Sequence, residues 1–268
     1  MAVDLHTHSS FSDGSDTPSE LVAKAVEMGL TALALTDHDT VDGIEAARAA
    51  ADGTTALIPG IELSVDWSGS PLHMLVYYLE PGRGPLQDRL QELKEGRHDR
   101  NERIVARLRD LGIDITLDEV RKEAGEGVAG RPHIARVLVL KSVVPHLPAA
   151  FEQYLRRGRP AYQERVRLQP EEAISLARAS GALPVVAHPH TMESNAGDFS
   201  AALAELAEIG LIGIECHYAE YGPEHRDQLA AKARSLGLIP TGGSDYHGTY
   251  KPAIELGRGR GDLVVPDE

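Results

Sequence analysis

Short apolar runs alternate along the chain with segments whose hydrophobic residues repeat at helical spacing. Strand-like runs lie at roughly 3–6, 32–36, 56–63, 72–79, 183–187, 212–217 and 238–242. Amphipathic helical patterns lie between several of these runs, at about 17–29, 170–181, 201–210 and 225–237. The first begins with Thr17-Pro18-Ser19-Glu20, a capping box with proline in the first turn. Alternating strands and helices with short connections favour parallel pairing through right-handed crossovers, and seven such strands predict a barrel related to the (β/α)8 type.

The strand pattern is absent between about residues 81 and 168. This stretch begins with the charged helical sequence PLQDRLQELKEGRHDRNERIVARLRDLG, and shorter helices are expected in TLDEVRKEA, RPHIARVLVL and LPAAFEQYLRR. Residues 81–168 are therefore predicted to form a helical insertion, and residues 1–80 with 169–268 a barrel domain. We expect the insertion to cover the active site.

Residues that can bind metal ions lie at seven separate points, nearly all directly after an apolar run. They are His6, His8, Asp13, His38, Glu62, His73, His188, Asp245 and His247. His6 and His8 are two residues apart, so on a strand both side chains point to the same face. Buried carboxylates need compensating positive charge. Imidazoles and carboxylates that converge from different strand ends predict a multinuclear site for divalent metals.

The charge distribution narrows the choice of substrate. A net charge of −14 argues against binding to long nucleic acid, duplex DNA or RNA included. Residues 81–168 carry a net charge of +5 and the rest of the chain −19. A basic segment on an acidic body is compatible with a small anionic substrate.

Other classes of protein are excluded by composition. No apolar run approaches the roughly 20 residues that a membrane crossing needs, and the N-terminus lacks the pattern of a signal peptide. The single cysteine, Cys216, rules out an internal disulfide. A cytoplasmic protein without a membrane partner is the simplest interpretation, and the sequence does not reveal the oligomeric state.

Five motifs carry a resemblance to a known family. HTHSSFSDG, ALTDHDT, GIELS, VAHPH and TGGSDYHG, in this order, resemble those of the polymerase-and-histidinol-phosphatase (PHP) domain proteins. The chain is most similar to a stand-alone branch whose helical insertion carries Gly-Arg-Pro-His, here Gly130–His133, and Gly-x-Pro-Ala-Tyr, here Gly158–Tyr162. The resemblance implies a distorted (β/α)7 barrel of the TIM-like, PHP type. It also implies a metal-dependent phosphoesterase, similar to 3′,5′-nucleoside bisphosphate phosphatases and to 5′→3′ exoribonucleases of short RNA.

The resemblance further implies how the ligands are shared among the ions. One ion is expected to be bound by His6, His8, Glu62 and Asp245, and a second by Glu62, His73 and His188. A third site would consist of Asp13, His38 and His247. Two or three divalent ions are therefore predicted. Mn²⁺ is expected, with Fe²⁺ and Zn²⁺ as alternatives, because ligation without thiolates suits all three.

The same resemblance suggests a mechanism. A hydroxide between two ions bridged by Glu62 is expected to attack phosphorus, with Asp245 as the second catalytic carboxylate. Arg131, His133 and Arg159 are expected to bind substrate phosphate, because guanidinium groups match phosphate oxygens. His217, at the end of IGIECHY, is the candidate for protonating the leaving group or for binding phosphate.

Three other functions remain open at this point. Histidinol-phosphate phosphatase would use the same ligands, although the Arg-Pro-His insertion argues against it. Hydrolysis of C–N bonds of the amidohydrolase type is possible at two metals, but the arginine-rich insertion favours an anionic substrate. A metal-binding scaffold without turnover is the third, and the complete ligand set weighs against it.

Overall fold

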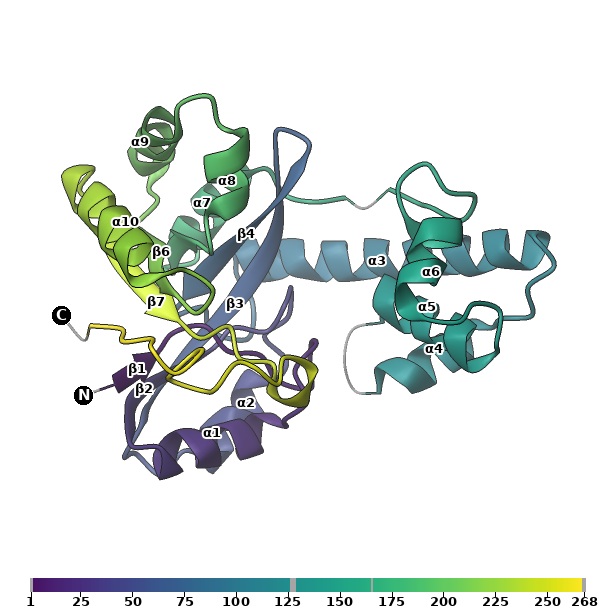
Figure 1. Cartoon of the computed structure of the whole chain (residues 1–268), viewed down its shortest axis with the longest axis horizontal. Coiled ribbons are helices and arrows are strands. Elements are labelled where there is room, and N and C mark those ends of the chain that lie inside the picture. Colours follow the sequence, from purple (N-terminus) through teal and green to yellow (C-terminus); the bar gives the residue numbers. More distant parts are fainter. Residues whose placement is uncertain (1, 126–128, 165, 267–268) are drawn as a thin grey trace. The chain divides into compact units, whose positions relative to one another are not determined.

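The computed structural model describes residues 2–125, 129–164 and 166–266, which divide into two compact units (Figure 1). The first unit takes in the chain up to Arg89 and again from Arg167, and the second is Leu90–Val166. The second unit is shorter than the predicted insertion 81–168. Its first helix begins in contact with the barrel, since the Leu86 amide donates to Ser180 Oγ at 3.0 Å.

The first unit is built on one seven-stranded sheet whose strands follow sequence order. The strands are β1 (Ala2–Asp4), β2 (Leu30–Leu35), β3 (Ala56–Trp67), β4 (Ser70–Tyr77), β5 (Leu183–Val186), β6 (Gly213–Tyr218) and β7 (Ile239–Gly243). The sheet curves so that its first and last strands come together. Two hydrogen bonds close the gap: the Leu5 amide donates to Gly242 O at 3.2 Å, and the Asp245 amide to His6 O at 2.9 Å. This nearly closed barrel confirms the predicted fold class.

One strand departs from the expected parallel arrangement. β4 pairs antiparallel with both β3 and β5. The reason lies in the turn between β3 and β4, where Ser68 and Gly69 both have positive φ angles, 49° and 84°. A turn this short returns the chain alongside β3, whereas a parallel strand would need a long crossover.

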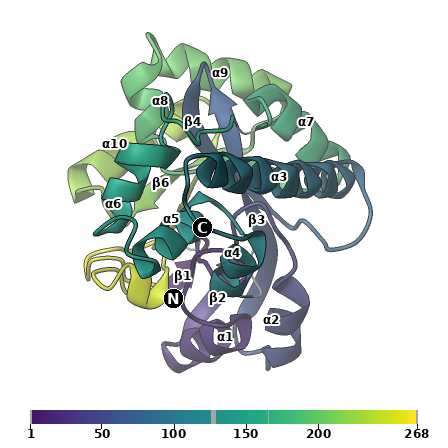
Figure 2. The same cartoon turned by 90° about the vertical axis from the view of Figure 1, so that its right-hand side faces the viewer.

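Helices pack against the outside of the barrel. They are α1 (Pro18–Glu27), α2 (Ile44–Ala50), α7 (Pro170–Ala179), α8 (His190–Asn195), α9 (Phe199–Ile209) and α10 (Pro223–Ser235), with a short 3-10 turn, η2 (Gly248–Tyr250). The α1 and α2 helices lie side by side (Figure 2) and bury Leu21 and Ile44 against Leu33 of β2. The predicted capping box of α1 is present, with Thr17 Oγ1 and the Glu20 carboxylate exchanging hydrogen bonds with each other's amides.

The ends of the described chain meet beside β1. The Asp4 carboxylate is fully buried and accepts hydrogen bonds from the amides of His6, Ser244 and Gly257 and from Ser244 Oγ. Leu263 and Val265 pack on Val3. The C-terminal segment, for which the sequence predicted no structure, therefore packs against β1 and stabilises the strand that precedes His6.

The regular elements of the second unit are all helices in its described residues. It holds most of α3 (Pro85–Asp110), then α4 (Leu117–Ala124), α5 (Arg131–Leu140), α6 (Leu147–Ala150) and a π-helical turn, η1 (Phe151–Leu155). Its separate core includes Ile104, Leu108, Val120, Ile134 and Leu138. That this unit covers the active site stays a prediction. The described residues of both units hold no helix with the length and hydrophobicity that crossing a membrane requires.

Candidate metal centre

Glu62 lies at the middle of a cluster of imidazoles. It is 1% exposed, and nitrogens of five side chains lie within 3.2 Å of its oxygens: His6, His8, His38, His73 and His188. Oε2 is 3.1 Å from His8 Nε2 and 3.1 Å from His38 Nδ1. Oε1 is 2.8 Å from His73 Nδ1. The two oxygens of one carboxylate thus face two different sets of ring nitrogens, as a bridging ligand would.

Two further carboxylates extend the cluster beyond Glu62. Asp245 Oδ1 lies 3.3 Å from His8 Nε2 and 3.3 Å from His247 Nδ1. Asp13 Oδ1 lies 3.3 Å from His247 Nε2. Asp13 is about half exposed and His8 fully buried, so the cluster runs from the barrel interior to solvent.

The structure brings all nine predicted ligands together, in four overlapping groups that could each hold an ion. They are His8, Asp13, His38 and His247; His6, Glu62 and His188; His6, His8 and Asp245; and His38, Glu62 and His73. The three residues expected to form a third site, Asp13, His38 and His247, fall in one of these groups together with His8. His38 also falls in a group with Glu62 and His73, so the division of ligands among ions that the resemblance implied stays a prediction.

The conformation of the backbone places several of these side chains close to Glu62. The loop after β2 continues alongside β3, with the Glu62 amide donating to Asp37 O at 3.2 Å and the Asp39 amide to Glu62 O at 3.0 Å, which sets His38 beside Glu62. His188 and Asp245 have positive φ angles of 22° and 57°, a conformation that costs non-glycine residues roughly 1–3 kcal/mol. Such strain is typical of functional sites.

A close approach of two strands also requires glycine. A Cβ atom at Gly243 would lie 2.4 Å from the His6 backbone nitrogen. Only glycine lets the end of β7 come this near to the segment that carries His6 and His8. The ligands from the two ends of the chain therefore meet because position 243 has no side chain.

The electrostatics of the cluster fit bound cations. Burial alone would lower the pKa of His8, but the Asp245 and Glu62 carboxylates raise it to about 10. Burial alone would raise the pKa of Glu62, whereas the imidazoles of His38, His73 and His6 hold it well below its usual value. Without metal, protons on imidazoles must supply the positive charge that these buried carboxylates need.

Two buried nitrogens give a more direct test of the fit. Nδ1 of His38 and Nδ1 of His73 have no hydrogen-bond partner in the described part of the chain, although each lies within 3.1 Å of a Glu62 oxygen. The distances between these nitrogens and the Glu62 oxygens are short enough for ion pairs, but the direction of the ring N–H does not allow a hydrogen bond to the carboxylate. A nitrogen and a carboxylate oxygen that face each other in this way suit joint ligation of one cation.

Glu215, which sequence reasoning missed, supports two of the ligands. Its side chain is fully buried on β6, and its oxygens lie 3.0 Å from His6 Nδ1 and accept a 2.8 Å hydrogen bond from the His188 amide. A carboxylate on the remote ring nitrogen of a metal-binding histidine fixes its tautomer and orientation. A charged residue inside the apolar run LIGIECHY was the signal that could have revealed it.

Asp245 is anchored by its outer oxygen. Oδ2 accepts hydrogen bonds from Tyr218 Oη at 2.9 Å and from Lys251 Nζ at 2.6 Å. Oδ1 is thereby aimed at the histidines. Neither Tyr218 nor Lys251 was predicted to take part in the site.

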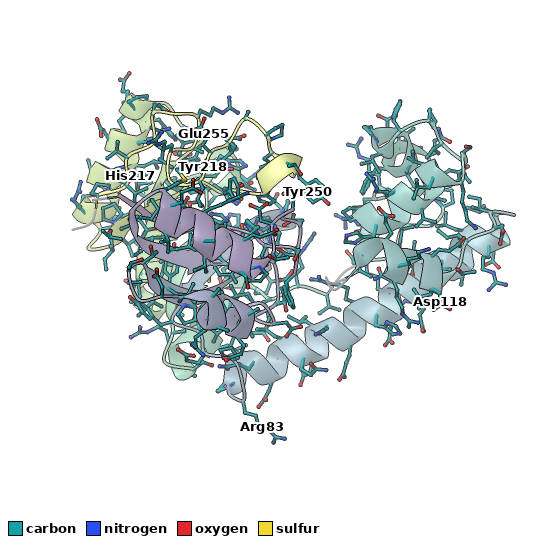
Figure 3. The ribbon with its side chains drawn as sticks, turned by 90° about the horizontal axis from the view of Figure 1, so that it is seen from below. Arg83, Asp118, His217, Tyr218, Tyr250 and Glu255 are labelled. Atoms are coloured by element: carbon teal, nitrogen blue, oxygen red, sulfur yellow. The ribbon has the colours of Figure 1, made fainter. Side chains whose placement is uncertain are left out.

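His217, the predicted proton donor and phosphate ligand, does not join the cluster. Burial and the nearby guanidinium groups of Arg226 and Arg234 lower its pKa, and both arginines belong to α10. A bulge between Glu215 and His217 shifts the pairing of β6 with β7. A bulge reverses the alternation of side chains, so Tyr218 rather than His217 reaches Asp245 (both are labelled in Figure 3). The role of His217 as proton donor or phosphate ligand stays a prediction.

The three predicted phosphate ligands of the insertion lie in the second unit. The Arg131 guanidinium carbon is 5.9 Å from the Phe151 ring centre and 5.7 Å from that of Tyr162, and Arg131 Nη1 donates to Leu155 O at 3.2 Å. His133 Nδ1 accepts a 3.1 Å hydrogen bond from the Gly130 amide. Arg159 is exposed. Their roles toward substrate stay predictions.

Sequence comparison identifies the family. Residues 4–128 match the PHP domain. The 5′-3′ exoribonuclease Rnm of Escherichia coli is 34% identical over 258 residues, which are 95% of this chain and 88% of that protein. The chain belongs to the PHP domain family. The 3′,5′-nucleoside bisphosphate phosphatase of Chromobacterium violaceum is 30% identical over 257 residues, 95% of this chain and 90% of that protein.

Solved structures agree with this PHP assignment. A crystal structure of a Bifidobacterium adolescentis protein, assigned there as a putative metal-dependent phosphoesterase, is 31% identical with a TM-score of 0.82, over 99% of this chain and 92% of that one. An amidohydrolase from Chromobacterium violaceum, with bound sulfate and no metal, is 29% identical with a TM-score of 0.78, over 93% of this chain and 88% of that one. The family predicted from the motifs is confirmed. The protein is a metal-dependent hydrolase of phosphate esters.

Proposed function

We propose that this PHP protein removes phosphate from small nucleotides, such as 3′,5′-nucleoside bisphosphates, and acts also on short 5′-phosphorylated oligoribonucleotides. The observation that carries the proposal is the cluster of nine ligands around Glu62. Support for the substrate class comes from the relatives named as a nucleoside bisphosphate phosphatase and as exoribonucleases.

We propose that the cluster holds two or three Mn²⁺ ions, with Glu62 shared between two of them. Its donors are imidazoles and carboxylates, a set that Fe²⁺ and Zn²⁺ also accept. Cys216, the single thiol of the sequence, belongs to none of the candidate ion groups of the described residues. When bound, such ions would lower the pKa of a water molecule and stabilise negative charge on phosphate oxygens.

The protein's own residues position the reacting groups for hydrolysis. In this reaction water adds to phosphorus, the P–O ester bond breaks and the alcohol leaves with a proton. Glu215 orients the ring of His6, and Tyr218 and Lys251 orient Asp245. These two metal-binding side chains therefore hold their positions before substrate binds. Preorganised donors contribute to the rate because they need no rearrangement in the transition state.

Arg131 is the proposed partner of a substrate phosphate, and its environment suits that role. Cation–π contacts with the Phe151 and Tyr162 rings restrict the movement of the guanidinium group. The hydrogen bond from the Gly130 amide leaves the proton of neutral His133 on Nε2, which makes that nitrogen a donor. Arg159 completes the proposed set. Each of these side chains can donate to phosphate oxygens.

Product analysis tests the proposal. The Mn²⁺-loaded protein is assayed with adenosine 3′,5′-bisphosphate, histidinol phosphate, a 5′-phosphorylated tetraribonucleotide and a simple carboxamide. Released phosphate is measured for the first two substrates, and chromatography detects mononucleotides from the tetranucleotide and the amine from the carboxamide. We expect turnover of the bisphosphate and the tetranucleotide well above that of histidinol phosphate. Preference for histidinol phosphate would assign the alternative phosphatase activity, and cleavage of the amide alone would indicate C–N hydrolysis. A protein that binds metal but hydrolyses none of the four would be the non-catalytic scaffold.

A further inference from the structure

A series of aromatic rings leads from the metal centre to the surface of the barrel unit. The His188 ring stacks on that of His6 with centroids 5.7 Å apart, and the His190 ring stacks with that of His188 at 5.4 Å and an interplanar angle of 28°. A second branch passes from His188 to Tyr218 at 5.3 Å and from Tyr218 to Tyr221 at 5.1 Å. Both branches start at the ring of His188, a candidate metal ligand.

His190 is the exposed end of the first branch. It opens α8, which packs beside β4, the strand of His73 (Figure 1). Its backbone amide donates to Tyr221 Oη at 3.1 Å, which joins the two branches. The residue is exposed, and its ring nitrogens have no hydrogen-bond partner among the residues that the structure describes. One face of this ring rests on a candidate metal ligand while the side chain as a whole remains open to solvent.

Tyr221, at the end of the second branch, is held in place by His225 and Glu193. The Tyr221 ring meets the His225 ring edge-on at 4.8 Å, and His225 Nε2 lies 3.3 Å from a Glu193 carboxylate oxygen on α8. Tyr221 and His225 are therefore held in place, whereas the His190 imidazole forms no hydrogen bond with α8 among the described residues and stacks on His188. The helix keeps its own bonds, such as that from Ser194 Oγ to His190 O at 2.7 Å.

We propose that His190, with Tyr221 beside it, forms a subsite for the nucleobase of the substrate. A base stacked on the exposed face of His190 would extend the row of rings that begins at His6, with its sugar phosphate toward the metal centre. Stacking suits substrates with different bases, because every base offers a π face to an aromatic side chain, histidine included. This subsite rests on the proposed function, since it presumes a nucleotide substrate.

Equilibrium binding tests the subsite independently of turnover. Calorimetry with the Mn²⁺-loaded protein compares AMP with ribose 5-phosphate, which has the same phosphate and sugar but no base. His190→Ala should weaken AMP binding by about tenfold, within the range for loss of a base–aromatic stack, and change ribose 5-phosphate binding by less than about twofold. His190→Phe, which keeps an aromatic face, should bind AMP nearly as the natural protein does. His98→Ala, which removes an exposed histidine of α3, should change neither affinity.

Equal losses for both ligands in His190→Ala, or no loss for either, would overturn the subsite. So would a natural protein that binds AMP no more tightly than ribose 5-phosphate, or that binds neither. Failure of the proposed function gives a different result. In that case the base preference and its dependence on His190 persist in the binding experiment, while adenosine 3′,5′-bisphosphate releases no phosphate.

Discussion

Glu215 offers a quantitative test of how the metal centre is held together. The Glu215→Gln change keeps the volume of the side chain but removes its charge and one of its two acceptor oxygens. The carboxylate contacts His6 Nδ1 at 3.0 Å and the His188 amide at 2.8 Å, so one of these contacts is lost in the variant. Both histidines belong to a single candidate ion group with Glu62.

The size of the effect follows from these two contacts. A hydrogen bond to a charged group contributes about 1.5–3 kcal/mol, and loss of such a partner behind a metal ligand typically weakens metal binding by about 10–100-fold. We therefore expect Glu215→Gln to weaken the affinity for one ion by about tenfold. Glu215→Ala, which removes both contacts, should weaken it by about 100-fold.

The assay is competition between the protein and a fluorescent chelator for Mn²⁺, with the stoichiometry from elemental analysis. Glu220→Gln is the matched control, because Glu220 follows the same strand and its one ion pair in the described part of the chain is an exposed one with Arg260. Thermal unfolding of each metal-free variant separates loss of ligation from loss of fold. Native affinity and stoichiometry in Glu215→Gln would refute the idea that this carboxylate orients the ligands.

Three further predictions concern the ions and the substrate. Glu62→Ala should abolish phosphate release and lower the bound metal by at least one ion per chain, and an active variant with full metal content would contradict the bridging role. Chelation should lower the midpoint of thermal unfolding reversibly, because an ion at 100 times its dissociation constant stabilises the folded state by about 2.7 kcal/mol; a midpoint that does not respond to Mn²⁺ would mean that the ligands bind no ion. Arg131→Ala should lower kcat/KM for adenosine 3′,5′-bisphosphate by about 30-fold, as expected for loss of a charge-assisted contact of about 2 kcal/mol, and should leave an aryl monophosphate nearly unaffected. A uniform loss on both substrates would place Arg131 at the scissile phosphate, and no loss on either would leave it without a role in binding.

The sequence predicted the barrel and the nine residues that cluster around Glu62, because both depend on short-range patterns. Apolar runs gave all seven strands, and the polar residues that follow them gave His6, His38 and His188. The antiparallel strand β4 was not foreseen, since an apolar run carries no direction, and only the turn at Ser68 and Gly69 reverses the chain.

The supporting residues were harder to predict than the ligands. In a strand buried on both faces, the pattern does not say which side chain points inward, so Glu215 was overlooked. Because of the bulge at the same place, Tyr218 rather than His217 contacts Asp245. A bulge depends on pairing with β7, far away in the sequence, and no local pattern announces it.

The hydrogen bonds of Asp4 join positions that are separated by nearly the whole chain, Ser244 and Gly257. Ribosomes make the N-terminus first, so His6 and His8 emerge long before Asp245 and His247 can meet them. We expect the nascent polypeptide to acquire its ions only near the completion of synthesis. Contacts between such distant positions also slow folding, because the loop must close before they contribute. Maturation of this enzyme is therefore expected to be governed by closure of the barrel rather than by the supply of metal.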